Sequence, residues 1–205
     1  AICDFSEFEF QKKVGTELGL MFCGSIFYLP VINFIIELYT KLRDNNIYSG
    51  NLVFAIGMGN EDKDGFDQLI NKINTNNYSK SIQINVNVPF EELISMYLQS
   101  ELLIVPLRNI IPDIAGFHHK IGEYTAAGKP VISSNFGELQ YYFKDGVSAI
   151  LADDYSLDSY FDKLSEVLKN KERLSSIAAE GHKVGETYLN FKSYAEPLKV
   201  FLHNL

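Results

Sequence analysis

The sequence predicts a doubly wound α/β domain, with six parallel strands in one Rossmann-like sheet. Short apolar runs alternate along the chain with segments whose apolar residues recur every three or four positions. This alternation is typical of strands joined by right-handed crossover helices. The runs 52–56 and 102–105 are continuously apolar, which indicates central strands covered on both faces. Residues 82–88 instead alternate between apolar and polar side chains, and this pattern predicts a strand at one edge.

We expect the spatial order 3-2-1-4-5-6, which places the third strand at an edge. In this order the later strands are added on the opposite side of the first strand from the second and third, so the strand order reverses between the first and fourth strands. A ligand should bind beyond the carboxyl ends of these two strands. The expected strands are 20–24, 52–56, 82–88, 102–105, 131–134 and 149–151. The expected helices lie within 30–42, 66–73, 93–97, 120–128 and 157–168, with further C-terminal helices at 174–188 and 194–205.

Composition restricts the class of protein. The chain has 205 residues, of which 46% are hydrophobic and 21% charged, so it is long and apolar enough for a folded core. Its net charge of −8 argues against binding nucleic acid, which requires a basic surface. Two cysteines, Cys3 and Cys23, are too few for a disulfide framework and favour a reducing compartment. No apolar run reaches the ~20 residues of a membrane span, and no signal peptide is recognisable.

The start of the chain indicates how the domain is organised. The sequence begins at Ala1 without a methionine, and we expect it to be part of a longer protein. Residues 1–18 are expected to form an irregular lead-in from a preceding domain. Residues 19–205 are expected to form the domain itself.

The segment 120–135 is the most informative about function. An amphipathic helix ends at Gly128, and Pro130 leads directly into the apolar strand 131–134. The amino end of such a helix, at the mouth of a parallel sheet, offers unpaired amides and the positive end of the helix dipole to a phosphate group. Glu123 lies within two turns of that end and could accept hydrogen bonds from sugar hydroxyls.

Several motifs follow one another with a recognisable spacing. The first expected strand ends in Phe22-Cys23-Gly24-Ser25, Gly116-Phe117 leads to Glu123, and Ala127-Gly128-Lys129-Pro130-Val131-Ile132 comes next. Asn135-Phe136-Gly137-Glu138 and Lys144-Asp145-Gly146-Val147 complete the series. From about Leu20 to Asp154 this series resembles the C-terminal, donor-binding domain of GT-B glycosyltransferases, especially glycosyltransferase family four.

The resemblance implies a function for the whole series. The donor would be a nucleoside-diphosphate sugar such as a UDP- or GDP-sugar, with no cofactor, no essential metal and retention at the anomeric carbon. The acceptor, a sugar or a lipid-linked glycan, would enter through an N-terminal domain that these residues do not contain. We therefore expect this domain to be inactive alone. A role in bacterial polysaccharide biosynthesis is a further expectation, as is a cytoplasmic location, with peripheral attachment of the longer protein to the inner face of the membrane left open.

Single residues can be matched to the family's donor site. The second glutamate of the family motif binds the ribose hydroxyls, and Glu123 stands in its place. Arg108 follows the fourth strand and Lys120 opens the signature helix, so each could bind phosphate oxygens. Gly24 and Ser25 end the first strand at the same edge of the sheet.

Four further residues are candidate contacts of the nucleotide. We expect the backbone amides of Phe117, His118 and His119 to face the phosphates. Val88 follows the third strand, where the family packs against the base, and it fits a hydrophobic entry into the next helix equally well. The paired histidines lack the convergent partners of a metal site, so no metal is predicted.

Three positions depart from the family pattern. Ala115, eight residues before Glu123, replaces the glutamate that contacts the donor sugar near the reacting carbon. Ser25 replaces the arginine after the first strand, and Glu138 replaces the second glycine of a Gly-Gly turn. No catalytic residue is assigned. Two alternatives remain open, namely a non-catalytic nucleotide-sugar-binding module and a GT-B enzyme that epimerises a UDP-sugar.

Overall fold

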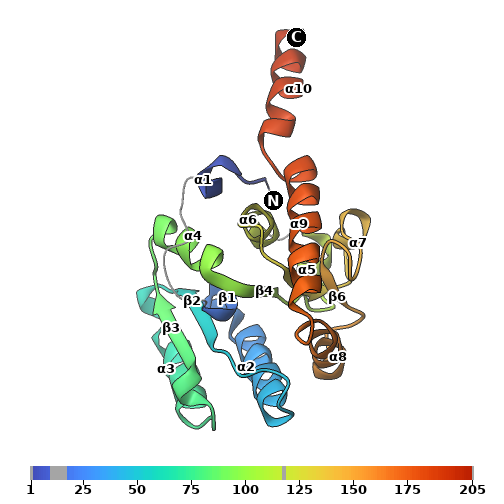
Figure 1. Ribbon diagram of the computed structural model, residues 1–205. Coiled ribbons are helices and arrows are strands. Elements are labelled where there is room, and N and C mark those ends of the chain that lie inside the picture. The colour runs from blue at the N-terminus through green and yellow to red at the C-terminus, as the bar shows by residue number, and fades with distance from the viewer. Residues whose placement is uncertain (1, 10–17, 117–118, 205) are drawn as a thin grey trace.

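The computed structural model describes residues 2–9, 18–116 and 119–204, which form one six-stranded sheet with helices on both faces (Figure 1). All five strand pairs are parallel. The order β3-β2-β1-β4-β5-β6 confirms the predicted doubly wound topology. The strands are β1 (Gly19–Ser25), β2 (Leu52–Gly57), β3 (Ile82–Val86), β4 (Ser100–Val105), β5 (Val131–Ser134) and β6 (Ile150–Ala152).

The helices match the expected series within a few residues and add short ones that periodicity did not predict. The long helices are α2 (Leu29–Asp44), α3 (Lys63–Asn74), α4 (Phe90–Gln99), α6 (His119–Ala126), α8 (Leu157–Val167), α9 (Lys171–Tyr188) and α10 (Lys192–His203). The short ones are α1 (Ser6–Glu9), α5 (Ile111–Ala115) and α7 (Leu139–Tyr142), with 3-10 turns η1 (Ile26–Tyr28), η2 (Asn60–Asp62) and η3 (Ser79–Ser81).

Two hydrophobic cores lie on the two faces of the sheet. Side chains alternate along a strand, so β1 contributes Leu20 and Phe22 to one core and Met21 to the other. The first core packs against α2, α3, α8 and the start of α9. The second packs against α1, α4, α6 and α7. In Figure 1, α2 and α4 accordingly lie on opposite sides of the sheet.

The predicted edge strand is confirmed, but it is shorter than expected. β3 lies at the edge of the sheet and ends at Val86, because Asn87 adopts a left-handed φ of 51°. Asparagine tolerates this conformation better than most residues. Its side chain accepts a hydrogen bond from the Met58 amide (2.9 Å) and donates one to the Met58 carbonyl (3.1 Å). The chain therefore turns toward α4 two residues early.

The amino-terminal residues are part of the fold as far as they are described. Phe5 and Phe8 are buried in the second core. The Cys3 amide donates to the Leu189 carbonyl (2.8 Å), and the Phe191 amide donates to the Cys3 carbonyl (3.0 Å). Residues 10–17 lie outside the described part, so the boundary at residues 18 and 19 stays a prediction.

The C-terminal helix α10 projects away from the sheet beyond the end of α9 (Figure 1). Its side chains include exposed large apolar residues such as Leu198, Val200 and Phe201. Within the described residues, no helix combines the length and the apolar character needed to cross a bilayer.

Helix α9 packs closely on the rest of the domain through two glycines. A Cβ atom at Gly181 would lie 2.5 Å from the Ser148 carbonyl oxygen, and one at Gly185 would lie 2.3 Å from Thr125 Oγ1 on α6. Real Cβ atoms do not approach so closely, so the helix axis can lie this near only without side chains at these positions.

We therefore expect Gly181→Ala to destabilise the domain by about 1–3 kcal/mol through overpacking. In an exposed helix the same substitution would instead stabilise the domain by about 0.5–1 kcal/mol. Urea unfolding followed by circular dichroism distinguishes the two signs. Gly57→Ala is the control, because a Cβ there would meet no described atom within 4 Å. A Gly181→Ala protein more stable than the wild type would contradict the packing.

Candidate functional site

The central strands β1 and β4 part at the predicted point of reversal. β1 pairs with β2 from Leu20 to Ser25, along almost its whole length. Its pairing with β4 extends only to Met21, opposite Leu103. The structure describes every residue of both strands, and the carboxyl-terminal half of β1 makes no pairing with β4. In open parallel sheets, this is where ligands bind.

A tyrosine of α6 accepts a hydrogen bond from the backbone of β1 where the pairing of β1 with β4 ends. The Cys23 amide donates a hydrogen bond of 3.0 Å to the Tyr124 hydroxyl oxygen. Tyr124 is fully buried, and burial, followed by the nearby Cys23 thiol, raises the pKa of its hydroxyl well above the usual range. The phenol therefore stays neutral. This bond satisfies the amide of a half-buried residue and fixes α6 relative to the carboxyl end of β1.

Lys120 and Glu123 form an ion pair on the same helix. Lys120 Nζ lies 2.8 Å from Glu123 Oε2, and the two side chains are 28% and 17% exposed. The hydroxyl of Tyr97, on α4, donates to the same oxygen at 2.9 Å. Lys120 Nζ also donates to Tyr97 Oη at 3.2 Å, which closes a triangle of three polar groups. The two predicted residues thus lie together, and they share a partner that the sequence did not reveal.

Charge in this cluster is balanced. Burial disfavours the ammonium form of Lys120, but the Glu123 carboxylate beside it favours that form, and the pKa of Lys120 lies above its usual value. Burial is also the main cause that raises the pKa of Cys23, which keeps this thiol protonated at neutral pH. The cluster therefore holds a cation close to a carboxylate, next to the carboxyl-terminal half of β1.

Arg108 follows β4 at the predicted edge, and its guanidinium pairs with a buried carboxylate. Its Nε and Nη2 atoms lie 2.9 and 3.1 Å from the two carboxylate oxygens of Asp113, and its own amide donates to Asp113 Oδ2 at 2.9 Å. Asp113 is 4% exposed. The pair raises the pKa of Arg108 and folds the loop after β4 back on itself. The sequence analysis missed Asp113, since nothing in its spacing marks it as a partner of Arg108.

The other predicted contacts are placed as follows. Gly24 and Ser25 end β1, and Ser25 Oγ accepts a hydrogen bond from the Phe27 amide at 3.2 Å. Val88 lies between β3 and α4, partly buried against the second core. His119 is the exposed first residue of α6.

Phe117 and His118 were also predicted to contact the phosphates, and both lie outside the described residues. In the part of the chain that is described, no three His, Cys, Asp or Glu side chains converge on a common point.

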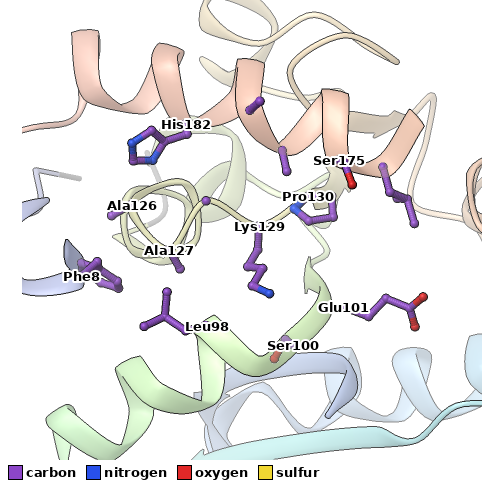
Figure 2. A pocket seen from close by; sticks show the side chains of 14 residues that line it. Phe8, Leu98, Ser100, Glu101, Ala126, Ala127, Lys129, Pro130, Ser175 and His182 are labelled. Carbon is purple, nitrogen blue, oxygen red and sulfur yellow. The ribbon is translucent and has the colours of Figure 1, made fainter. Parts of the chain in front are cut away.

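A pocket of about 600 Å³ opens at the opposite edge of the sheet, at the amino ends of β4 and β5. Figure 2 shows the Lys129 side chain running from the turn after α6 toward Ser100 and Glu101, with Ser175 and His182 of α9 on the other side of that turn. Ser100 and Pro130, at the starts of the two strands, also line the pocket. It is separated from the Lys120–Glu123 cluster by the length of α6, so it is not the predicted site.

Solved structures confirm the fold. Anabaena Alr3699/HepE in complex with UDP and glucose aligns with a TM-score of 0.79 at 11% identity, covering 100% of this chain and 56% of that one. Sucrose-phosphate synthase from Thermosynechococcus elongatus aligns at 0.76 with 16% identity, covering 99% and 49%. The C-terminal domain of a Francisella tularensis glycosyl transferase group 1 protein, LpcC, aligns at 0.70 with 19% identity, covering 93% and 94%.

This chain therefore spans about half the length of the first two proteins and nearly all of an isolated C-terminal domain. Among curated proteins, no sequence matches it significantly. The family model described as glycosyl transferases group 1 matches residues 4–184, most of the chain. The chain belongs to the glycosyl transferases group 1 family.

Proposed function

We propose that this domain binds a nucleoside-diphosphate sugar and is the donor-binding half of a glycosyltransferase. The observation that carries the proposal is the meeting of Lys120 and Glu123 on α6, beside the half of β1 that leaves β4. The solved structures supply a first ligand to test. HepE was solved with UDP and glucose, and the pneumococcal O-GlcNAc transferase GtfA, similar in fold, was solved with UDP and GlcNAc.

Each group has a chemical role in this proposal. Glu123 accepts hydrogen bonds from the ribose hydroxyls, because a carboxylate forms short, strong bonds with adjacent donors. Lys120 and the first amides of α6, which have no partner within the helix, attract the diphosphate. Arg108 stands at the end of β4 in a bidentate pair with Asp113, so it can offer the diphosphate only the N–H groups that the carboxylate does not bind.

The reaction moves a glycosyl group from the diphosphate to an acceptor hydroxyl. The bond from the anomeric carbon to the diphosphate oxygen breaks, a bond to the acceptor oxygen forms, and the acceptor loses its proton. The diphosphate leaves with additional negative charge, so catalysis depends on cations and amides placed to stabilise it. We propose retention at the anomeric carbon, and we assign the acceptor site and the remaining catalytic groups to residues outside this domain. The domain alone should then bind donor weakly and not turn it over.

A non-catalytic nucleotide-sugar-binding module is the second candidate. Ala115 lacks the carboxylate that the family motif places there, and Glu138 has a side chain where the motif has glycine. The Ser25 hydroxyl, at the position of the family's arginine, caps a 3-10 turn. Assays of a longer protein that contains this domain separate the two candidates, because donor binding without sugar transfer or donor hydrolysis supports the module.

Glu123→Gln should weaken the binding of a nucleoside diphosphate by about 1–2 kcal/mol, since a neutral amide accepts hydrogen bonds less strongly than a carboxylate. Isothermal titration calorimetry with UDP, GDP, ADP and UDP-glucose measures the change. Gln is preferred to Ala because truncation would also leave the buried Tyr97 hydroxyl without its acceptor.

Glu180→Gln is the matched control. It breaks the ion pair of Glu180 with Lys183, which also joins residues three apart on a helix but lies on the exposed face of α9. The control should leave nucleotide affinity unchanged. Undiminished affinity in folded Glu123→Gln protein would refute the role given to this carboxylate.

Donor binding should not depend on a divalent metal, because amides and cationic side chains take the charge of the diphosphate in this proposal. The affinity for UDP measured in EDTA should equal the affinity measured with added Mg²⁺ or Mn²⁺. A severalfold loss of affinity on chelation, restored by either metal, would contradict this part of the proposal.

A further inference from the structure

The two oxygens of the Glu123 carboxylate differ in the hydrogen bonds that they accept from the protein. Tyr97 Oη and Lys120 Nζ both donate to Oε2, at 2.9 and 2.8 Å. Among the described residues, no recorded hydrogen bond reaches Oε1. One oxygen is thus occupied by two donors within the protein, and the other keeps its capacity to accept.

Tyr97 is suited to fix this arrangement, because it is itself immobilised. It is fully buried in the last two turns of α4, a different helix from the one that carries Glu123. Its ring packs edge-on against that of Tyr124, with centroids 5.1 Å apart. Tyr124 in turn holds the Cys23 amide of β1. The hydroxyl of Tyr97 is therefore tied, through packed rings, to the strand at whose carboxyl end the ligand is expected.

The hydroxyl remains a donor under all physiological conditions. Burial, followed by the nearby Tyr124, Cys23 and Glu123, raises the pKa of Tyr97 far above its usual value, so the phenol keeps its proton. A buried donor of this kind has no water to bond with; the Glu123 carboxylate is its charged acceptor, and the Cys23 thiol also lies within hydrogen-bonding reach of it. Such a fixed contact limits the rotation of the carboxylate more than the partly exposed Lys120 ammonium could alone.

We propose that Tyr97 is a positioning residue of the donor site, which together with Lys120 holds Oε2 of Glu123 and so leaves Oε1 to accept the ribose hydroxyls. This inference rests on the proposed function. It assigns the recognition of the sugar to one oxygen of Glu123 and the orientation of the carboxylate to a residue on another helix.

The test compares a ribonucleoside diphosphate with its 2′,3′-dideoxy counterpart. The diphosphate is whichever of UDP, GDP and ADP binds wild-type protein most tightly. If Glu123 accepts the hydroxyls, the dideoxy compound should bind wild type about tenfold or more weakly by calorimetry. In Tyr97→Phe this ratio should fall to about threefold or less, while the affinity for the dideoxy compound stays unchanged.

Tyr39→Phe is the matched control. It removes the hydroxyl of another buried tyrosine, which donates to the Gly50 carbonyl at 2.8 Å on the opposite face of the sheet. It should keep the wild-type ratio. A general loss of stability would lower the affinities for both compounds together, so the ratio isolates positioning from folding.

A wild-type ratio retained in Tyr97→Phe would overturn the inference and leave the proposed function standing. Wild-type protein that does not distinguish the two compounds, or binds neither, would refute the role of Glu123 and the inference with it. Should Tyr97→Phe fail to fold, Lys120→Met removes the other donor to Oε2 and leaves Tyr97 in place. The affinities for both compounds should then fall together while their ratio stays near the wild-type value. Loss of the ratio in that variant would assign the orientation of the carboxylate to Lys120 and overturn the inference.

Discussion

The hydrogen bond between Tyr124 and the Cys23 amide is the contact on which the candidate site depends. Where the strand order of this sheet reverses, β1 stops pairing with β4 after Met21, and the amides on that side of β1 need other partners. Here the phenol of Tyr124 supplies a partner. The same contact fixes α6, and with it Lys120 and Glu123, which precede Tyr124 on that helix. One hydrogen bond thus both provides a partner for the β1 amide and places the polar side chains of α6.

This arrangement explains why a short helix can carry several functions. Tyr124 faces the second core, while Lys120 and Glu123 meet Tyr97 of α4. Gly128, with a left-handed φ of 61°, ends the helix and allows the chain to enter β5 at once. On its other side α6 packs against α9, where Gly185 permits close approach to Thr125. The position of the cluster is therefore determined by packing on every side of the helix.

The sequence was sufficient to predict the strand order and the edge position of β3, because solid and alternating apolar runs report directly on burial. It was also sufficient to place Lys120 and Glu123 on one helix. It could not predict that Tyr97 contacts them. In the run 93–97 this tyrosine fits the apolar stripe of a helix, and the partner of its hydroxyl depends on how two helices pack. The role of Asp113 could not be predicted for a related reason, since its burial follows from the path of a loop with no periodic pattern.

The central claim is that nucleotide binds at the carboxyl edge of the sheet rather than in the pocket at the amino edge. Titration of UDP into ¹⁵N-labelled protein, followed by amide chemical shifts, tests it most directly. Binding at the carboxyl edge should shift the amides of Gly24, Ser25 and residues 119–124 most. Shifts concentrated instead at Ser100, Lys129 and His182, which line the opposite pocket, would contradict it.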